Sequence, residues 1–320
     1  MIRLKLFITS NVPDEVYEKL KDEFEIKYHD SNIPLTKEEL IEGVKGQDAI
    51  LCPLSDKITK EVIDAGEDLK IIANYGAGFD NIDIAYAREK GIDVSNAPAP
   101  SSALSTAELT MGLILAAGRK IVSGDKLLRD GGFFGWRPTF YLGHQLKDKT
   151  LGIIGLGKIG TNLARLAKAF QMNVIYNSRT RKEDKEKELG ITYKSREEVI
   201  KEADFLSLHS AFAPELKHMI STEAFKMMKD SAILINAARG PLVDEAALVK
   251  ALQTGDIAAA ALDVYEFEPA VTEELLTMDN VVLAPHLGNA TFEARLEMGN
   301  HAVKNLLAKK KGEEIPNLVN

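Results

Sequence analysis

Cysteine, basic charge and long apolar runs are all scarce in this chain of 320 residues. The single cysteine, Cys52, excludes a disulfide within the chain, and no cysteine cluster indicates zinc, so we predict no metal site. Because Cys52 lies in the apolar run AILCPL, we interpret it as a buried, inert thiol. The net charge of −8 lacks the basic excess that a phosphate backbone requires, which argues against a nucleic-acid partner.

Segments typical of membrane spans and secretory signals are missing as well. Apolar runs such as MGLILAAG are far too short to cross a bilayer. The N-terminal sequence MIRLKLFITS lacks a long apolar segment followed by a small-residue cleavage site. We therefore expect a cytoplasmic protein without a membrane partner, and the chain length favours two domains.

What the chain does contain is a regular alternation of β-rich runs and helical periodicity, typical of α/β proteins with parallel sheets. In the first hundred residues, four helices are expected between the strands, at 13–24, 36–46, 59–67 and 82–91. The expected strands are 4–9, 24–29, 49–54, 70–76, 92–96, 150–155, 173–177, 191–194, 205–210, 232–238, 257–264 and 281–287.

A proline-rich break, NAPAPSSA at 96–103, separates the two series of strands. Pro98 and Pro100 argue against a regular helix there, and Ser101 or Ser102 is expected to cap one long helix over 104–124. If that helix crosses between two lobes, a hinged cleft is expected. An amphipathic helix over 291–312 follows the last strand.

A glycine-rich turn, GLGKIG, follows the buried strand at 151–154 and precedes an amphipathic helix. Gly155, Gly157 and Gly160 provide a tight turn, room for a pyrophosphate and close packing of helix on strand. The helix N-terminus at Lys158 and Ile159 supplies free N–H groups for phosphates. In this strand–turn–helix context the motif predicts a dinucleotide site.

An acidic residue is missing from the place where such sites usually carry one, about 20 residues after the glycines. No acid appears between Tyr176 and Glu183. Ser178, Arg179 and Arg181 instead offer a hydroxyl and two cations, which suit a phosphate dianion. We therefore predict that the site prefers NADP(H) and can also accept NAD(H). The alternative interpretation is that these residues form only a solvated charged loop.

Polar side chains follow the last three strands, and in such sheets ligands bind at the carboxyl ends of strands. Arg239, Glu268 and His286 can therefore converge beside the cofactor. An arginine fork can hold a carboxylate, and histidine can donate a proton to a carbonyl oxygen while a glutamate orients its ring. Alone, each residue is as well explained by a structural role; together they indicate reduction of a 2-oxo acid.

The segments GLGKIG, NAARGPLVDEAAL, ALDVYEFEP and PHLGNAT, in this order and spacing, resemble the D-isomer-specific 2-hydroxyacid dehydrogenase family. The resemblance covers essentially the whole chain. It implies two doubly wound lobes: a Rossmann dinucleotide-binding domain at 100–288, inserted into a flavodoxin-like substrate domain at 1–99 plus 289–320. It also implies that Arg239 binds and polarises the 2-oxo acid, that His286 donates the proton and that Glu268 pairs with it.

The resemblance extends to further site residues. Asp263 resembles the residue that faces the nicotinamide carboxamide, Thr106 the residue that packs on the ring, and His209 a position lining the cofactor, although the family more often has Cys-Pro-Leu-Thr there. Ala237 and Gly288 are further cofactor candidates. The candidates for the substrate pocket are Pro53, Leu54, Tyr75, Trp136 and the loop Gly76, Ala77 and Gly78, whose amides meet the substrate carboxylate in the family.

The missing acid and the segment WRPTFYLG resemble the NADPH-using glyoxylate and hydroxypyruvate reductase branch. That branch implies a homodimer, in which Trp136 either reaches the partner's pocket or packs at the interface. One departure is Pro98-Ala99-Pro100, where the family often has Pro-Gly, so the course of the hinge stays open.

These patterns together predict an enzyme that uses NADPH to reduce glyoxylate, hydroxypyruvate or a 2-keto sugar acid to the D-2-hydroxy acid. The alternative is a dinucleotide-sensing binding protein, like the co-repressors of the family, without important turnover. Formate dehydrogenase is a third interpretation, but its members carry Gln at the position of Glu268.

Overall fold

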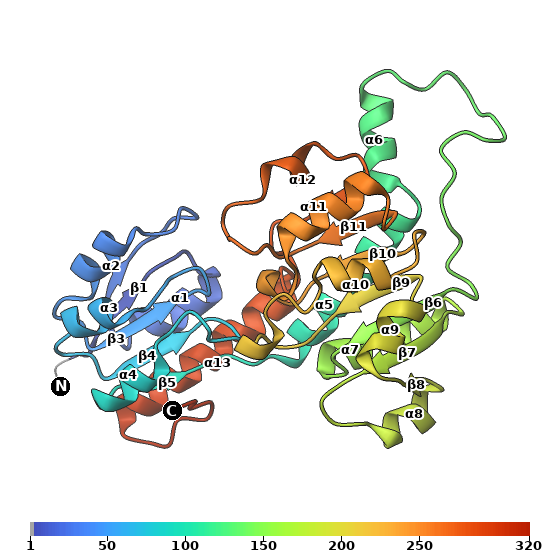
Figure 1. Cartoon of the computed structure of the whole chain (residues 1–320). Coiled ribbons are helices and arrows are strands. Elements are labelled where there is room, and N and C mark those ends of the chain that lie inside the picture. The colour runs from blue at the N-terminus through green and yellow to red at the C-terminus, as the bar shows by residue number, and fades with distance from the viewer. Residues whose placement is uncertain (1–2) are drawn as a thin grey trace. The chain divides into compact units, whose positions relative to one another are not determined.

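The computed structural model describes residues 3–320 and divides the chain into two compact units (Figure 1). The first unit comprises the residues up to Ser102 together with Thr291–Asn320, and the second comprises Ala103–Ala290. The chain passes from one unit to the other at two points, and each point lies a few residues after the domain boundary expected from the sequence. The second unit is thus an insertion in the sequence of the first.

The first unit is built on a parallel sheet of five strands in the order β2-β1-β3-β4-β5. Its central strands are buried on both faces, as expected for a parallel sheet covered by helices. The strands are β1 (Lys5–Ile8), β2 (Glu25–Tyr28), β3 (Ala49–Cys52), β4 (Ile71–Asn74) and β5 (Asp93–Ser95). The helices are α1 (Asp14–Lys21), α2 (Lys37–Val44), α3 (Lys60–Ala65), α4 (Ile84–Glu89) and α13 (Phe292–Lys311).

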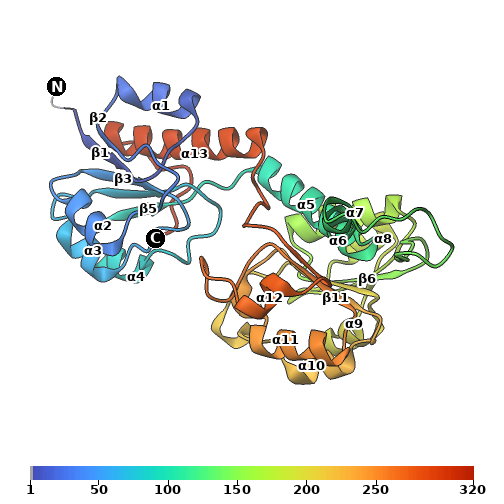
Figure 2. The same ribbon diagram turned by 90° about the horizontal axis from the view of Figure 1, so that it is seen from above.

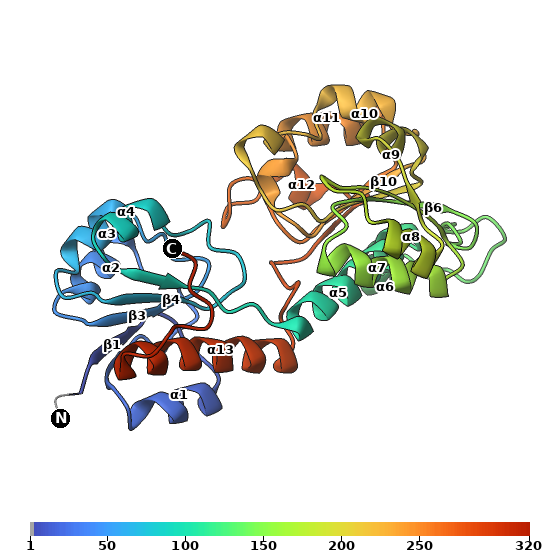
Figure 3. The same ribbon diagram turned by 90° about the horizontal axis from the view of Figure 1, so that it is seen from below.

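Two apolar clusters, one on each face, hold these helices to the sheet. Val16 of α1 and Met298 of α13 belong to one cluster, and Leu40 of α2, Val62 of α3 and Ala87 of α4 belong to the other. The same division is visible in Figures 2 and 3, where α1 lies beside α13 and α2 to α4 lie across the sheet. This is the doubly wound arrangement expected from the sequence.

The second unit contains a parallel sheet of seven strands in the order β12-β11-β10-β9-β6-β7-β8. The order reverses between β6 and β9, which is the switch point where doubly wound sheets bind ligands. The strands are β6 (Thr150–Ile154), β7 (Asn173–Asn177), β8 (Thr192–Tyr193), β9 (Phe205–Leu208), β10 (Ile233–Asn236), β11 (Ala259–Leu262) and β12 (Val281–Leu283).

Helices cover both faces of this second sheet. Met111 of α5 (Pro100–Gly118) and Leu163 of α7 (Lys158–Ala169) belong to one apolar cluster. The opposite cluster contains Val199, Phe225, Leu248 and Leu275, one residue each from α9 (Arg196–Glu202), α10 (Thr222–Met227), α11 (Glu245–Thr254) and α12 (Glu273–Thr277). The remaining helices are α6 (Ile121–Arg129), α8 (Glu183–Leu189) and the short 3-10 helices η1 (Pro214–Leu216) and η2 (Gly240–Leu242). The predicted fold class, two doubly wound parallel-sheet lobes, is confirmed.

The prediction of one long helix over 104–124 is wrong. Helix α5 begins at Pro100, because proline needs no N–H partner at the first helical position, and Ser101 lies inside the first turn instead of capping it. The N–H of Ser101 donates to the Glu297 carboxylate over 3.0 Å. The helix ends at Gly118, whose carbonyl accepts from the N–H of His144, and Lys120 (φ 55°) then separates α5 from α6.

Two titratable side chains near the end of β3 are buried, and one of them lacks a full set of hydrogen bonds. Cys52 is buried, as the sequence predicted, and burial raises the pKa of its thiol well above the usual value. Asp56 is only 2% exposed. Its Oδ2 accepts from the Thr9 hydroxyl, but Oδ1 has no hydrogen-bond partner among the residues that the structure describes. Burial raises the pKa of Asp56 to about 6, against the opposing effect of the Thr9 hydrogen bond.

Asp56→Asn is expected to stabilise the protein at alkaline pH but not in acid. Because the folded-state pKa exceeds the unfolded value, the favourable contribution of protonated Asp56 is complete below about pH 4 and is lost as the pH rises through about 6. The neutral amide avoids this loss, so the variant should gain roughly 3 kcal/mol relative to wild type at high pH. Urea unfolding of both proteins at several pH values measures the gain. A difference in stability that does not change with pH would contradict the expectation.

Candidate active site

The glycine turn after β6 has the geometry of a phosphate-binding loop. Gly155 has φ +104°, and a Cβ added there would lie 2.5 Å from the carbonyl carbon of His209. A Cβ at Gly160 would lie 2.3 Å from the Gly155 carbonyl oxygen, so this glycine allows α7 to pack closely on the turn. A Cβ at Gly157 would meet nothing within 4 Å, and no side chain caps α7 there. The first-turn N–H groups of α7, at Lys158 and Ile159, therefore remain available to an anion.

His209, at the end of β9, carries an uncompensated polar atom next to this turn. Its Nε2 shares a hydrogen bond with the Ser207 hydroxyl at 2.8 Å, whereas Nδ1 is shielded from solvent and has no partner in the described part of the chain. Burial lowers the pKa of His209 to about 4, so the ring is neutral. A shielded nitrogen beside an open glycine cradle fits a site that is completed by a bound ligand.

The end of β7 separates the roles of the two predicted arginines. Arg181 makes a bidentate ion pair with Glu186, with two N–O distances of 2.8 Å, and this pairing lowers the pKa of Glu186 to about 2. Arg179 is exposed and has no partner within residues 3–320. The Ser178 hydroxyl donates to the Thr180 carbonyl at 2.6 Å, which leaves its oxygen free to accept. Of the two guanidinium groups, Arg179 is therefore the one available to a ligand.

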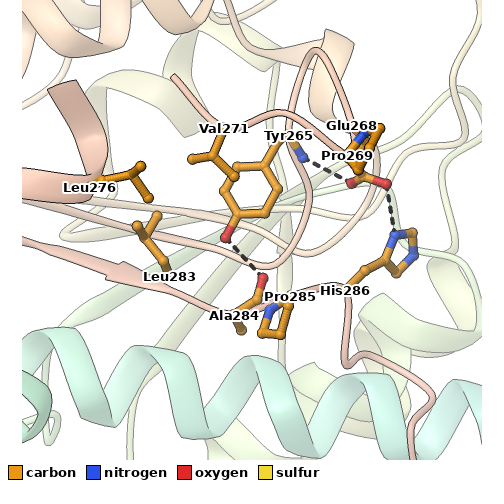
Figure 4. Close-up of a pocket in the computed structure, with 9 residues that line it drawn as sticks. All are labelled: Tyr265, Glu268, Pro269, Val271, Leu276, Leu283, Ala284, Pro285 and His286. Carbon is orange, nitrogen blue, oxygen red and sulfur yellow. Dashed lines mark hydrogen bonds and ion pairs between the residues drawn. The ribbon is translucent and has the colours of Figure 1, made fainter. Parts of the chain in front are cut away.

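Two of the three predicted catalytic residues are in direct contact. His286 Nδ1 lies 3.0 Å from Glu268 Oε2, and the N–H of Tyr265 donates to Glu268 Oε1 over 3.0 Å (Figure 4). Burial alone would raise the pKa of Glu268, but the hydrogen bond and charge of His286, the Tyr265 N–H and the charge of Arg239 together lower it below 4.5. Glu268 is therefore a carboxylate at neutral pH, and its bond to Nδ1 leaves Nε2 of His286 for another partner.

Asp263 fixes the turn that carries His286. The Asp263 carbonyl accepts from the His286 N–H, and its two carboxylate oxygens accept from the N–H groups of Leu287 and Gly288, over 2.6 and 2.8 Å. Burial raises the pKa of Asp263, and these two N–H groups partly oppose the rise. A Cβ at Gly288 would lie 3.3 Å from the Thr106 hydroxyl, so three predicted cofactor residues lie together. His286 itself adopts φ 55°, a left-handed conformation that is uncommon for residues other than glycine, although histidine, asparagine and aspartate adopt it more often than the rest.

The loops that carry Arg239 and Glu268 pack directly on each other. A Cβ at Gly240 would lie only 1.8 Å from the Tyr265 carbonyl oxygen, so only glycine permits this approach. The Asn236 side chain donates to the Arg239 carbonyl over 3.0 Å and thereby holds the turn after β10, which also contains the buried Ala237. The carboxyl ends of β10, β11 and β12 thus bring Arg239, Glu268 and His286 to one edge of the sheet.

A pocket of about 360 Å³ lies against the Glu268–His286 pair. The pair borders one end of it, and the apolar side chains of Val271, Leu276 and Leu283 border the other (Figure 4). Tyr265 lies between them, and its hydroxyl donates to the Ala284 carbonyl over 2.9 Å. The Glu268–His286 pair thus remains accessible from solvent, with both side chains more than a third exposed.

In the first unit, the predicted substrate loop contains backbone N–H groups that have no partner among the described residues. The carbonyl oxygens of Gly76, Ala77 and Gly78 all accept hydrogen bonds, from the Ala97 N–H and from the side chains of Asn96 and Asn74. The N–H groups of the same three residues donate to no other described residue. Free N–H groups on successive residues can bind an anion where the backbone turns so that they converge.

Two other substrate candidates contact this loop in different ways. A Cβ at Gly76 would lie 2.9 Å from Leu54 Cγ, so Leu54 packs on the loop and adjoins Pro53. The Tyr75 side chain is buried, and its hydroxyl donates to the Arg295 carbonyl in α13 over 2.6 Å. The hydroxyl of Tyr75 is therefore already engaged within the first unit.

Sequence reasoning missed the polar groups that hold these loops, namely the side chains of Asn74 and Asn236 and the backbone N–H of Tyr265. A signal for two of them was present, because β4, β7 and β10 each end in asparagine after an apolar run. A polar residue at that point can bond the loop that follows the strand.

Two further observations concern the part of the chain that the structure describes. None of its helices has the length and hydropathy needed to cross a membrane. No group of three or more His, Cys, Asp or Glu side chains within it is placed to hold a metal ion.

The fold, the glycine turn and the strand-end groups Arg239, Glu268 and His286 are those of a nicotinamide-dependent oxidoreductase.

Comparison with known proteins identifies the family. Residues 111–288 match the model of the D-isomer specific 2-hydroxyacid dehydrogenase, NAD binding domain. A Staphylococcus aureus protein with the provisional name 2-hydroxyacid dehydrogenase is 50% identical over 316 residues, which cover 99% of each chain. The chain therefore belongs to the D-isomer specific 2-hydroxyacid dehydrogenase family, and it is an NAD(P)-dependent enzyme of that family.

Solved structures agree over the whole chain. The structure of a protein from Thermus thermophilus has a TM-score of 0.92 and 38% identity, covering 99% of this chain and 100% of that one. An NADPH-dependent glyoxylate/hydroxypyruvate reductase from Sinorhizobium meliloti, solved with NADP and malonate, has a TM-score of 0.84 and 31% identity, covering 99% of this chain and 97% of that one.

Proposed function

We propose that the protein uses NADPH to reduce a small 2-oxo acid, such as glyoxylate, hydroxypyruvate or a 2-keto sugar acid, to the D-2-hydroxy acid. The observation that carries the proposal is the Glu268–His286 pair, at 3.0 Å, on the strand ends next to Arg239. The similarity to an NADPH-dependent glyoxylate/hydroxypyruvate reductase supports the choice of substrate class and cofactor.

The residues present fit a nicotinamide dinucleotide. The open cradle at Gly157 and the N-terminus of α7 would hold the pyrophosphate, between the close-packed glycines 155 and 160. The cluster of Thr106, Asp263 and Gly288 would border the nicotinamide, with Ala237 and the unpartnered Nδ1 of His209 as further contacts. When bound, NADPH supplies the hydride for the carbonyl carbon.

The chain's own groups bind the substrate and supply the proton. Arg239 offers a guanidinium fork for the carboxylate and the 2-oxo oxygen. The loop amides at 76–78 are proposed to bind the carboxylate as well. His286 donates its proton from Nε2 to the carbonyl oxygen, while Glu268 accepts the bond from Nδ1 and stabilises the charged ring.

Cofactor preference is proposed to depend mainly on Arg179. The end of β7 carries Asn177, whose side chain donates to the Lys194 carbonyl, and offers no carboxylate to a ribose. The Ser178 hydroxyl and the unpaired Arg179 guanidinium can instead bind a 2′-phosphate. Arg181 is held by Glu186 and is proposed to contribute less.

The proposed assembly is a homodimer formed through an aromatic arm, defined as α6 and residues 130–145. In Figure 1 the arm extends away from the sheet of the second unit. Phe134 and Trp136 are 82% and 81% exposed, and Leu128, Phe133 and Leu142 are exposed as well. Apolar surface of this extent on one segment is typical of a protein–protein interface.

The function is tested by following the loss of NADPH absorbance with a panel of 2-oxo acids, for wild type and His286→Asn. Removal of the proton donor should lower kcat by about a hundred- to ten-thousandfold and leave the KM for NADPH unchanged. His218→Asn is the matched control, because His218 makes a similar pair with Glu266, at 2.6 Å, in the same unit. NADPH binding without turnover of any 2-oxo acid would favour a dinucleotide-sensing protein instead.

The cofactor proposal predicts that Arg179→Ala raises the KM for NADPH about ten- to a hundredfold, because a charge-assisted bond to phosphate is lost. The KM for NADH should stay nearly constant. Arg181→Ala serves as the control and should change either KM by less than about threefold, since its charge is already paired at the surface. An equal rise for both cofactors in Arg179→Ala would disprove the assignment.

The assembly proposal predicts a dimer that dissociates when the arm becomes polar. Phe134→Ser combined with Trp136→Ser should shift the mass found by sedimentation equilibrium toward the monomer, because buried apolar area is lost. Ile33→Ser, at an exposed apolar residue of the first unit, should leave the mass unchanged. Trp136→Ala alone separates the two roles considered for this residue: a raised KM for the 2-oxo acid indicates a contact with the partner's pocket. A monomeric wild type would refute the proposal.

A further inference from the structure

The loop at 76–78 owes its anion-binding shape to side chains that do not themselves face an anion. In each peptide plane the C=O and the N–H point in opposite directions, so fixing a carbonyl fixes the next N–H. The Gly76 carbonyl is held by the Ala97 N–H, the Ala77 carbonyl by Asn96 over 2.8 Å, and the Gly78 carbonyl by Asn74 over 2.5 Å. These bonds fix the N–H groups of Ala77, Gly78 and Phe79, each of which points opposite to the carbonyl of its own peptide plane.

Gly78 is held from both sides by side-chain amides. Asn96 bonds the carbonyl that precedes it, and Asn74 bonds the carbonyl of Gly78 itself. Because glycine has the widest choice of backbone conformations, a free loop would lose much conformational entropy on binding an anion. Two fixed carbonyls remove much of that freedom before any ligand arrives.

Asn74 is itself rigidly held. It lies at the end of β4 and is 1% exposed. Its Oδ1 accepts from the side chain of Asn81, which is 7% exposed, at 3.3 Å. The Asn81 amide also lies within hydrogen-bond distance of the Pro53 and Asp56 carbonyls, at 3.2 and 3.0 Å. Asn81 therefore links the loop at 76–78 to the segment that carries Leu54.

We propose that Asn74 is a positioning residue for the 2-oxo acid. Asn74 and Asn96 together form a clamp that holds the backbone on both sides of Gly78. The inference rests on the proposed function, in which the loop amides bind the substrate carboxylate. Asn74 itself touches no substrate atom, because its amide group is engaged by Gly78 and Asn81. The adjoining N–H of Phe79, which the sequence did not indicate, is assigned to the anion site as a consequence of the clamp.

The test compares Asn74→Ala and Asn74→Leu with wild type. The alanine removes the donor to Gly78, and a leucine of similar size cannot donate either. Both variants should raise the KM for the 2-oxo acid about tenfold, with kcat within about threefold of wild type, since one orienting hydrogen bond is lost. The KM for NADPH should not change. Inhibition by oxamate, an unreactive analogue of a 2-oxo acid, should weaken by a similar factor.

Thr9→Val is the matched control for stability. The substitution removes a buried hydrogen-bond donor from the first unit, and Thr9 does not contact the loop at 76–78. The variant should therefore have a lower Tm and an unchanged KM for the 2-oxo acid. A lower Tm with unchanged KM and oxamate inhibition in both Asn74 variants would overturn the clamp while leaving the proposed function in place. A wild-type protein that neither reduces 2-oxo acids nor binds oxamate in calorimetry would overturn both.

Discussion

The parallel direction of every paired strand is the constraint on which this structure depends. Because each sheet is parallel throughout, all its strands deliver their carboxyl ends to one edge, and the loops after them meet there. Arg239, Glu268 and His286 are separated widely in sequence but follow three neighbouring strands, β10, β11 and β12. The chemistry of the site is therefore a consequence of strand direction and order before any individual contact is considered.

Short polar side chains then turn this rough placement into a defined geometry. Asn74 holds the Gly78 carbonyl, Asn236 holds the Arg239 carbonyl, and Asp263 binds the N–H groups that follow His286. All of them lie at or next to the end of a buried strand, so their own positions are fixed by the core. Loops with unfavourable backbone conformations, such as the one at His286 with φ 55°, are stable because several hydrogen bonds hold them in place.

The sequence was sufficient to predict whatever depends on local pattern. Apolar periodicity located the strands, and the spacing of Gly155, Gly157 and Gly160 predicted the turn that the structure contains. Individual side-chain and loop contacts were not predictable, either between distant segments or between near neighbours. Helix α5 ends where the N–H of His144 reaches the Gly118 carbonyl, and Arg181 pairs with the nearby Glu186 because the first turn of α8 brings that carboxylate close. A charged residue in a sequence shows that a cation is present, but only the fold shows whether it is already paired.

The state of the only cysteine has a practical consequence. Cys52 is enclosed at the end of β3 and its thiolate is strongly disfavoured, so maleimides and other alkylating agents should find no reactive sulfur on the native surface. The natural chain is thus already a background suitable for labelling. A cysteine introduced in the aromatic arm or beside the glycine turn could carry a fluorophore or spin label without removal of the native one.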